Sequence, residues 1–422
     1  MAYDVIGKSI LRVDGLAKVT GKAVYPQDIY MEDMVYGKTF RSTKAHANIK
    51  VDISKAEKLD GVLKVFTAKD VKGENHHGVL FKDHQVFCAK KVRRIGDPIA
   101  FVVAESEKRA QDALDLIQVQ YEELEAVFDP EEAMKEDSPK IHDNESNIIY
   151  HYKIRKGKDI DEAFKECDVV VENTYKTSMT DHAFIQPEAG VSYVDEGGTV
   201  VVCVATQYPH FDQIEVAEAL GVDKEKVRII NPAVGGAFGG REDITLQIHI
   251  AIAASYLKKP IKTIYSREES FIAHSKRHPV TMHVKTGAKK DGTLHAMEAR
   301  IIGDSGAYAS WAINVLRKTG VHISGPYVIK NVKVDSIAVY TNNPFTGAMR
   351  GFGAAQAPIA YESQMDSLAE KLNMSPLEIR LKNAFRHGCE TATGQILTES
   401  IPIVKCLEAV SKAMNLKEDG DR

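Results

Sequence analysis

Two glycine-rich segments constrain this chain more than any other feature. They are residues 235–242, which read GGAFGGRE, and residues 350–356, which read RGFGAAQ; each places a phenylalanine between glycines. Glycine has no Cβ, so the backbone there can approach a ligand closely or adopt a positive φ. A run with helical character follows each segment, and a helix start offers unpaired N–H groups. The two segments therefore predict loops that converge on one large, planar, anionic ligand.

Neither loop matches a phosphate-binding fingerprint. The first is not GxGxxG or GxxxxGK[ST], because Arg241 and Glu242 follow its last glycine where a P-loop would have lysine. A purely structural reading also stands for each loop, as a tight turn between a strand and a helix. Glu242 is then a partner of the helix dipole, Phe352 a core side chain and Arg350 the partner of a carboxylate. Alternatively, Glu242 and Phe352 face a ligand.

A third feature is an amide at the end of a strand. Residues 200–204 are all valine or cysteine, and Thr206-Gln207 follow them before Pro209 interrupts the run. Strand ends are where α/β proteins place functional side chains. Gln207 is either such a side chain or an ordinary surface amide.

Composition narrows the class of protein. The chain has 422 residues and a net charge of −4, so its size allows more than one domain and no nucleic-acid partner is indicated. Its five cysteines are scattered without CxxC spacing, which argues against a zinc or iron–sulfur site in this chain. The N-terminus has no signal-peptide pattern, and no apolar run approaches the ~18 residues of a membrane span. We expect a cytoplasmic protein with no membrane partner.

The periodicity predicts an α+β fold in two parts. Residues 1–125 form a small α/β domain, residues 126–148 form a linker rich in Glu, Asp, Pro, Asn and Ser, and residues 149–422 form a larger α+β domain. Asp291-Gly292 predicts a hairpin turn between two alternating runs. The expected strands are 62–66, 98–104, 118–121, 169–171, 200–204 and 227–230, and the expected helices are 106–116, 212–219, 244–257, 355–372 and 403–414.

In order along the chain, these features and several short motifs resemble the molybdenum-binding part of the xanthine oxidase family of molybdenum hydroxylases. The resemblance covers nearly the whole chain and implies a small α/β "hammerhead" domain followed by a larger molybdopterin-binding domain. The motifs are Arg12-Val13-Asp14, Lys18-Val19-Thr20-Gly21-Lys22-Ala23-Val24-Tyr25 with Asp28, Arg41-Ser42 with Ala45-His46-Ala47, Ile95-Gly96-Asp97-Pro98, Thr206-Gln207, residues 235–242, Arg267-Glu268-Glu269, Gly306-Ala307-Tyr308 and Arg350-Gly351-Phe352-Gly353.

The resemblance implies a cofactor site without protein ligands to the metal, because this family holds molybdenum through the dithiolene of a pterin. Gln207 matches the glutamine that hydrogen-bonds an oxo ligand of molybdenum, which makes it a catalytic residue as well. Bacterial members generally carry the cytosine dinucleotide form of molybdopterin, with a terminal sulfido or, rarely, selenido ligand. The cofactor-binding residues expected from the matching motifs are Gln207, Gly236, Phe238, Gly239, Arg350 and Gly351.

The same resemblance implies three substrate-binding residues. Glu242 matches an acidic residue that orients the substrate in purine-oxidising members, and it is the second catalytic candidate. Phe352 matches an aromatic that stacks on the substrate ring. Lys318 falls within a residue or two of a family position where purine-oxidising members have a substrate-binding arginine. The pattern fits a flat nitrogen heterocycle: nicotinate, hydroxylated to 6-hydroxynicotinate, or else a purine such as xanthine, with an aldehyde as a further alternative.

One catalytic part has no counterpart in the sequence. The family's general base is a glutamate in a Gly-x-Gly-Glu motif of a second molybdenum domain, and the only Gly-Glu here, Gly73-Glu74, lies in the hammerhead region. Either the chain is a fragment or the enzyme is split. We expect a split enzyme, with a second molybdopterin subunit, an iron–sulfur subunit with [2Fe-2S] clusters and an FAD subunit that passes electrons to NAD(P). The alternatives from other classes are a non-catalytic scaffold subunit and a nucleotide-binding enzyme.

Overall fold

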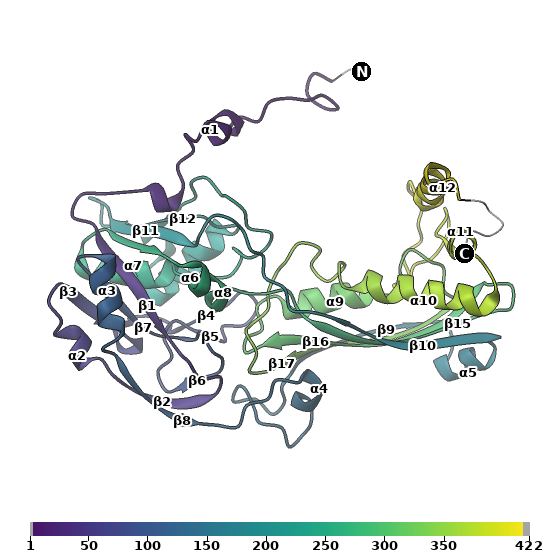
Figure 1. The fold of residues 1–422 in the computed structure, drawn as a ribbon, viewed down its shortest axis with the longest axis horizontal. Coiled ribbons are helices and arrows are strands. Elements are labelled where there is room, and N and C mark those ends of the chain that lie inside the picture. Colours follow the sequence, from purple (N-terminus) through teal and green to yellow (C-terminus); the bar gives the residue numbers. More distant parts are fainter. Residues whose placement is uncertain (1–2, 417–422) are drawn as a thin grey trace.

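The computed structural model describes residues 3–416, which form two lobes joined side by side (Figure 1). One lobe contains residues from about 26–125 together with about 180–275, and the other contains most of the remaining chain. Strands and helices are mixed in both lobes, which confirms the predicted α+β class. No helix among the described residues is long and apolar enough to cross a membrane.

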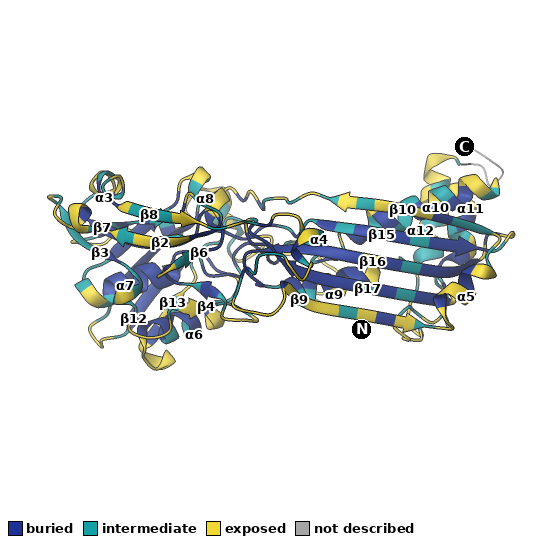
Figure 2. Cartoon of the chain, turned by 90° about the horizontal axis from the view of Figure 1, so that it is seen from below, coloured by how far each residue is buried: buried dark blue, intermediate teal, exposed yellow. Residues whose placement is uncertain are grey.

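A seven-stranded mixed sheet forms the centre of the first lobe, in the order β13-β12-β11-β14-β1-β7-β3. β1 pairs with β14 in parallel through Val35 and Ile261, so the beginning and the middle of the chain share one sheet. Strands β7 and β12 are apolar throughout, and both are buried along nearly their whole length (Figure 2). The bounds are β1 Val35–Arg41, β3 Val62–Phe66, β7 Pro98–Ala104, β11 Ala189–Val194, β12 Val200–Val204, β13 Val227–Ile230 and β14 Ile261–Ile264.

Helices and two small sheets complete this lobe. Helix α7 is buried along most of its length, from Gln247 to Ala254, because most of its residues are apolar. The buried polar residues Gln247 and His249 have hydrogen-bond partners, Asp212 and the Val86 carbonyl. The small sheets have the orders β6-β2-β8 and β4-β5. The bounds are α2 Ser54–Glu57, α3 Glu107–Leu114, α6 Pro209–Leu220, α7 Gln247–Leu257, α8 Arg267–Ala273, β2 Ala47–Asp52, β4 His76–His77, β5 His84–Gln85, β6 Lys91–Val92 and β8 Gln118–Glu123.

The second lobe is a long five-stranded sheet in the order β10-β15-β16-β17-β9, with helices on both faces (Figures 1 and 2). Alternate residues of β16 explain the two faces: Met297, Ala299 and Ile301 pack toward α9 and α10, whereas Ala296 packs toward α5. The bounds are β9 Ile148–Lys156, β10 Val169–Thr177, β15 Val280–Ala288, β16 Leu294–Gly306, β17 Asn331–Tyr340, α5 Ile160–Lys165, α9 Ala312–His322, α10 Ala357–Leu372, α11 Pro376–Asn383 and α12 Ile403–Met414.

Residues 126–148, the predicted linker, pack against the second lobe. They contain the short helix α4 (Pro130–Ala133), and Val127, Ala133 and Ile141 are buried in one cluster with residues of β16 and β17. Two long segments lie at the edges of the body instead. Residues 3–24, with the short helix α1 (Gly15–Val19), extend away from the first lobe, and α12 stands above the end of the second lobe (Figure 1).

Candidate functional site

A cleft of about 550 Å³ is lined by residues of both lobes. Gln207, Phe238 and Glu242 line it from the first lobe, and Trp311 and Asn314 at the start of α9 line it from the second. The second glycine loop, from Ala348 to Phe352, completes the lining. The structure therefore brings both glycine loops and Gln207 to one cavity.

The two loops share an unusual backbone conformation. Phe238 has φ of 54° and Phe352 has φ of 46°, a region that non-glycine residues rarely adopt, and each has a glycine with positive φ next to it. Such strained residues cluster at functional sites. A Cβ at Gly239 would lie 2.5 Å from the carbonyl oxygen of Ala348, so only glycine allows the loops to come this close.

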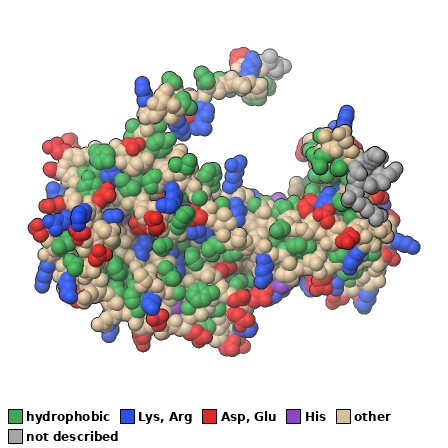
Figure 3. Space-filling view, viewed as in Figure 1, with side chains coloured by type: hydrophobic (Ala, Val, Ile, Leu, Met, Phe, Trp, Pro, Cys, Tyr) green, Lys and Arg blue, Asp and Glu red, His purple; other side chains and the backbone are tan. Residues whose placement is uncertain are grey.

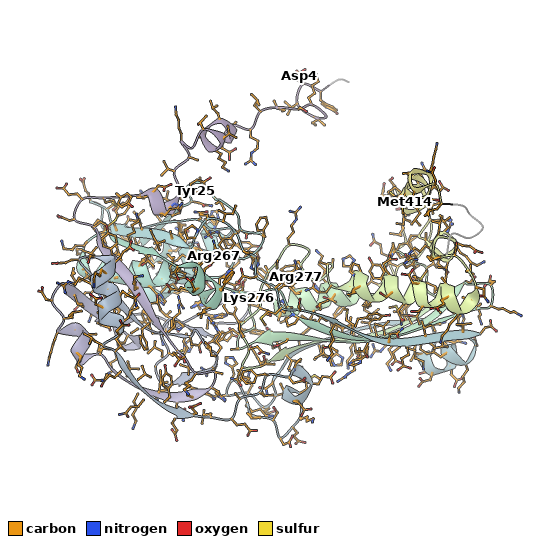
Figure 4. The ribbon with its side chains drawn as sticks, viewed as in Figure 1. Asp4, Tyr25, Arg267, Lys276, Arg277 and Met414 are labelled. Atoms are coloured by element: carbon orange, nitrogen blue, oxygen red, sulfur yellow. The ribbon has the colours of Figure 1, made fainter. Side chains whose placement is uncertain are left out.

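The loops are tied to each other and to a buried layer beneath them. The Arg350 N–H donates to the Phe238 carbonyl over 2.8 Å, and the Arg277 guanidinium donates to the Arg350 carbonyl over 2.8 Å. Figure 4 places Arg277 where the lobes join. His182 Nε2 lies 2.7 Å from the Ala348 carbonyl, and burial lowers the pKa of His182 to about 4, so this ring is neutral and donates through Nε2.

The loops present free backbone donors. Within residues 3–416, the N–H groups of Gly236, Ala237 and Phe238 and that of Gly351 make no hydrogen bond. Successive unpaired N–H groups form concavities that bind anions and oxygen atoms. Arg241 does not serve this purpose, because its guanidinium is buried and donates to the carbonyls of Gly236 and Gln186.

Gln207 is held by the first loop. Its Oε1 accepts from the Gly239 N–H at 2.9 Å and from the Arg241 N–H at 3.4 Å, so the amide nitrogen is the end that faces away from the loop. Nε2 lies 3.4 Å from Glu242 Oε1, its one partner among the described residues. The end of β12 and the loop after β13 thus bring together two residues that are 35 positions apart.

Glu242 has an altered acidity. Burial, and then the neighbouring charge of Asp243, raise the pKa of Glu242 from 4.5 to about 7. Asp243 is buried, accepts a hydrogen bond from Ser310 Oγ at 2.7 Å, and has a pKa raised to about 6 by burial. At neutral pH the Glu242 carboxyl is therefore protonated in a substantial fraction of molecules and can donate a hydrogen bond. The expected position of Glu242 at a helix start is wrong, because α7 begins at Gln247 and Glu242 lies in a turn before it.

Aromatic side chains line the side of the cleft formed by α9. The rings of Phe352 and Trp311 lie edge to face with their centroids 5.9 Å apart, and the centroids of the Trp311 and Tyr208 rings are also 5.9 Å apart. Lys318 Nζ lies 5.9 Å from the Phe352 ring, and its side chain is exposed. Trp311 Nε1 is buried and has no hydrogen-bond partner within residues 3–416.

The sequence reasoning missed Trp311, Asn314 and Tyr208. Trp311, Asn314 and Lys318 have the i, i+3, i+7 spacing that places side chains on one helix face. Trp311 is also the only tryptophan in the chain. The spacing around Lys318 and this single tryptophan are the signals that point to α9 as part of the cleft.

The structure holds all the predicted site residues close to the cleft. Gln207, Phe238, Gly239, Glu242, Arg350 and Phe352 line it directly. Gly236 and Gly351 do not line it but are neighbours of these residues in the two loops, and Lys318 Nζ lies 5.9 Å from the centroid of the Phe352 ring. Their roles toward a ligand stay predictions. No group of three or more His, Cys, Asp or Glu side chains within residues 3–416 is arranged to hold a metal ion.

Comparison with known proteins identifies the family. A sequence profile described as "Molybdopterin cofactor-binding domain" matches residues 141–384, and one described as "Aldehyde oxidase and xanthine dehydrogenase, a/b hammerhead domain" matches residues 20–125. The chain belongs to the xanthine oxidase family of molybdenum hydroxylases. This confirms the resemblance drawn from the motifs and places the chain among molybdenum-dependent oxidoreductases.

The relatives differ in length. The chain is 48% identical over 407 residues to the nicotinate dehydrogenase large molybdopterin subunit of Eubacterium barkeri, covering 96% of this chain and 95% of that one. It is 37% identical over 411 residues to a probable xanthine dehydrogenase component from Bacillus subtilis, covering 97% and 55%. The aldehyde oxidoreductase structure from Desulfovibrio gigas superposes with a TM-score of 0.92 at 32% identity, covering 96% and 46%. The chain thus spans about half the length of the last two.

Proposed function

We propose that this chain is the large molybdopterin subunit of a multi-subunit hydroxylase that converts nicotinate to 6-hydroxynicotinate with oxygen from water. The observation that carries the proposal is the 48% identity to a nicotinate dehydrogenase subunit over nearly the full length of both chains. The cleft supports it, because its aromatic lining and its few polar groups suit a flat heterocycle.

The described residues fit a molybdopterin cofactor in the cleft. The free N–H groups at Gly236 to Phe238 and at Gly351 suit the oxygens and anionic groups of such a ligand, and the unengaged hydrogen of Gln207 Nε2 suits an oxo group. The bound cofactor supplies the redox and oxygen-transfer chemistry. We propose the cytosine dinucleotide form with a terminal sulfido or selenido ligand. The protein's contribution is to hold and orient the cofactor through Gln207 and the loops.

Substrate orientation follows from the chemistry of nicotinate. Its C6 atom lies next to the ring nitrogen, and its carboxylate lies on the opposite side of the ring. Phe352 and Trp311 cover the ring with aromatic surface, and Lys318, beside Phe352, supplies a cation for the carboxylate. The carboxylate then lies toward α9, and C6 lies toward Gln207 and the first loop.

Glu242 activates the ring in this arrangement. With a pKa of about 7 its protonated form is abundant at neutral pH, and it donates a hydrogen bond to the ring nitrogen. This bond withdraws electrons from C6, which makes that carbon a better electrophile. Gln207 Nε2, 3.4 Å from Glu242 Oε1, keeps the carboxyl oriented toward the substrate.

The remaining parts of the enzyme are assigned to partner polypeptides. We propose that a second molybdopterin subunit supplies the general base, because Glu242 is the one carboxylic acid among the described residues that line this cleft. An iron–sulfur subunit with [2Fe-2S] clusters and an FAD subunit then carry electrons to NAD(P). All five cysteines of this chain are free, which suits a cytoplasmic enzyme.

A xanthine or purine dehydrogenase is the second candidate, favoured by the 37% identity to the Bacillus subtilis relative. Glu242 and Phe352 suit a purine equally well. Lys318 favours nicotinate, since xanthine has no carboxylate to pair with it.

A substrate screen of the purified native complex tests the proposal. Nicotinate, xanthine, hypoxanthine and an aromatic aldehyde are compared at equal concentration, and the products are identified by mass. We expect 6-hydroxynicotinate to form with the highest kcat/KM. Preferential oxidation of xanthine would favour the second candidate, and preferential oxidation of the aldehyde would contradict both.

A further inference from the structure

The N-terminal arm, residues 3–24, exposes a series of large apolar side chains. Helix α1 within it has no buried residue, and Figure 1 shows the arm leaving the body of the first lobe. A five-residue helix is unstable by itself in water, and extended apolar surface of this kind marks a binding surface. The exposed apolar residues are Tyr3, Val5, Ile6, Ile10, Leu11, Val13, Leu16, Val19 and Val24.

The base of the arm lies beside the first glycine loop. The Val24 carbonyl accepts a hydrogen bond from the Ala233 N–H at 3.2 Å, and the Tyr25 ring lies 3.2 Å from where a Cβ of Gly235 would be. Tyr25 and Asp4, labelled in Figure 4, mark the base and the tip of the arm. The base of the arm therefore lies next to the loop that lines the cleft.

Helix α12 is a second uncovered apolar surface. Ile403, Leu407, Val410 and Met414 follow the i, i+4, i+7, i+11 spacing of one helix face, yet α12 has no buried residue, and Val410 and Met414 are exposed. The arm and α12 project on the same side of the molecule, and the surface between them is concave in Figure 3. Met414 in Figure 4 marks the far end of this surface.

The longer relatives suggest what covers these elements. This chain matches 55% of the Bacillus subtilis relative and 46% of the aldehyde oxidoreductase, so each contains a further half that this chain does not match. Residues 3–19 and α12 also lie outside both matched family profiles, which span 20–125 and 141–384. A second copy of this chain would not supply that further half, so we do not expect a homodimer to cover these elements.

We propose that the arm and α12 form one two-sided docking surface, which grips the polypeptide corresponding to that further half and seats it over the cleft. The proposal rests on the proposed function, because it takes that polypeptide to be the second molybdopterin subunit. The partner presents apolar surface to the arm and to α12, and it occupies the concave region between them. Its docking positions its catalytic groups opposite Gln207 and Glu242.

The test uses the native complex, purified through a tag on this chain. One variant carries Leu11→Asp, Val13→Asp and Val19→Asp, and another carries Val410→Asp and Met414→Asp. The matched control carries Phe81→Asp and Phe128→Asp, which are also exposed but belong to neither element. Subunit content is measured by sedimentation over a dilution series, and thermal unfolding of each tagged chain is measured alone.

We expect both test variants to lose the second molybdopterin subunit and to contain less molybdenum than the wild-type complex. Each aliphatic side chain buried at an interface is worth about tenfold or more in Kd, so the arm variant should bind at least roughly 1,000-fold more weakly. The thermal unfolding of each variant chain should match wild type, because none of the substituted side chains is buried within the chain. The control should keep the second molybdopterin subunit.

Retention of the second molybdopterin subunit by either test variant would overturn the two-sided surface, and so would its loss from the control. Conversion of a homodimer of this chain to monomers by these substitutions would also overturn it, since a second copy would then be the occupant. Failure of the proposed function gives a different result. A wild-type complex that needs the arm and α12 to keep its second subunit, but does not hydroxylate nicotinate, would contradict the proposed function and support the docking surface.

Discussion

Glu242→Gln separates a substrate-facing acid from a structural one. The substitution preserves the size of the side chain and removes its ionisation. If Glu242 donates to the ring nitrogen, the weaker amide donor loses part of a hydrogen bond to a polar heterocycle. A hydrogen bond between two neutral groups contributes about 0.5–1.5 kcal/mol, so kcat/KM should fall by roughly 2- to 13-fold. Molybdenum content should change little, because the loops keep their own ties.

The pH dependence of activity tests the role of Glu242 independently. Activity of wild type should fall as pH rises through about 7, because the Glu242 carboxyl then loses the proton that it donates. The Gln variant keeps its N–H at every pH, so this limb of the profile should disappear.

Stability supplies the third readout. The folded pKa of about 7 lies above the ordinary 4.5, so between these values the folded chain keeps a proton that the unfolded chain releases, and stability falls as pH rises. The full shift corresponds to about 3 kcal/mol, which partial exposure reduces to about 1–2 kcal/mol. Thermal unfolding should therefore show the Gln variant more stable than wild type at pH 8 and equal to it at pH 4.5. Parallel losses of molybdenum and activity, with no stabilisation at pH 8, would show that Glu242 is a structural residue and not a substrate-facing acid.

Three further changes test the neighbouring residues. Lys318→Met should raise KM for nicotinate roughly 2- to 5-fold, as expected for the loss of an exposed ion pair, and Lys318→Arg should restore it. The KM for pyridine substrates that have no carboxylate should not change. An equal rise in KM for nicotinate and for these pyridines would contradict this role of Lys318. Gly239→Ala should destabilise the loop by about 1–3 kcal/mol and lower the molybdenum content of the complex. Gly198 also has a positive φ, but a Cβ there would have no atom within 4 Å, so the Gly198→Ala control should keep its molybdenum. Asp243→Asn removes a charge that raises the Glu242 pKa, so the alkaline limb of kcat/KM should move to lower pH; an unmoved limb would argue against the coupling.

Local patterns predicted much of the fold. The apolar run at 98–104 became β7 and the one at 200–204 became β12, and Asp291-Gly292 does join β15 to β16. The helix expected at 403–414 has these limits in the structure. These signals are local, since they depend on the hydrophobic period and on turn residues.

The arrangement in space depends on contacts that no local pattern encodes. Pairing of β1 with β14 joins positions more than 200 residues apart and places β1, β3 and β7 in one sheet with strands of the middle region. For the site, the motifs indicated Gln207 and Glu242 but not their 3.4 Å contact. Trp311 was missed because it precedes a helix that the sequence reading had not predicted.

The most direct test of the proposed function is the molybdenum and pterin content of the purified complex, measured together with its turnover of nicotinate. We expect molybdenum and a pterin to copurify with this chain and turnover to rise in proportion to molybdenum occupancy. A complex free of molybdenum and pterin that hydroxylates nicotinate at full rate would contradict it.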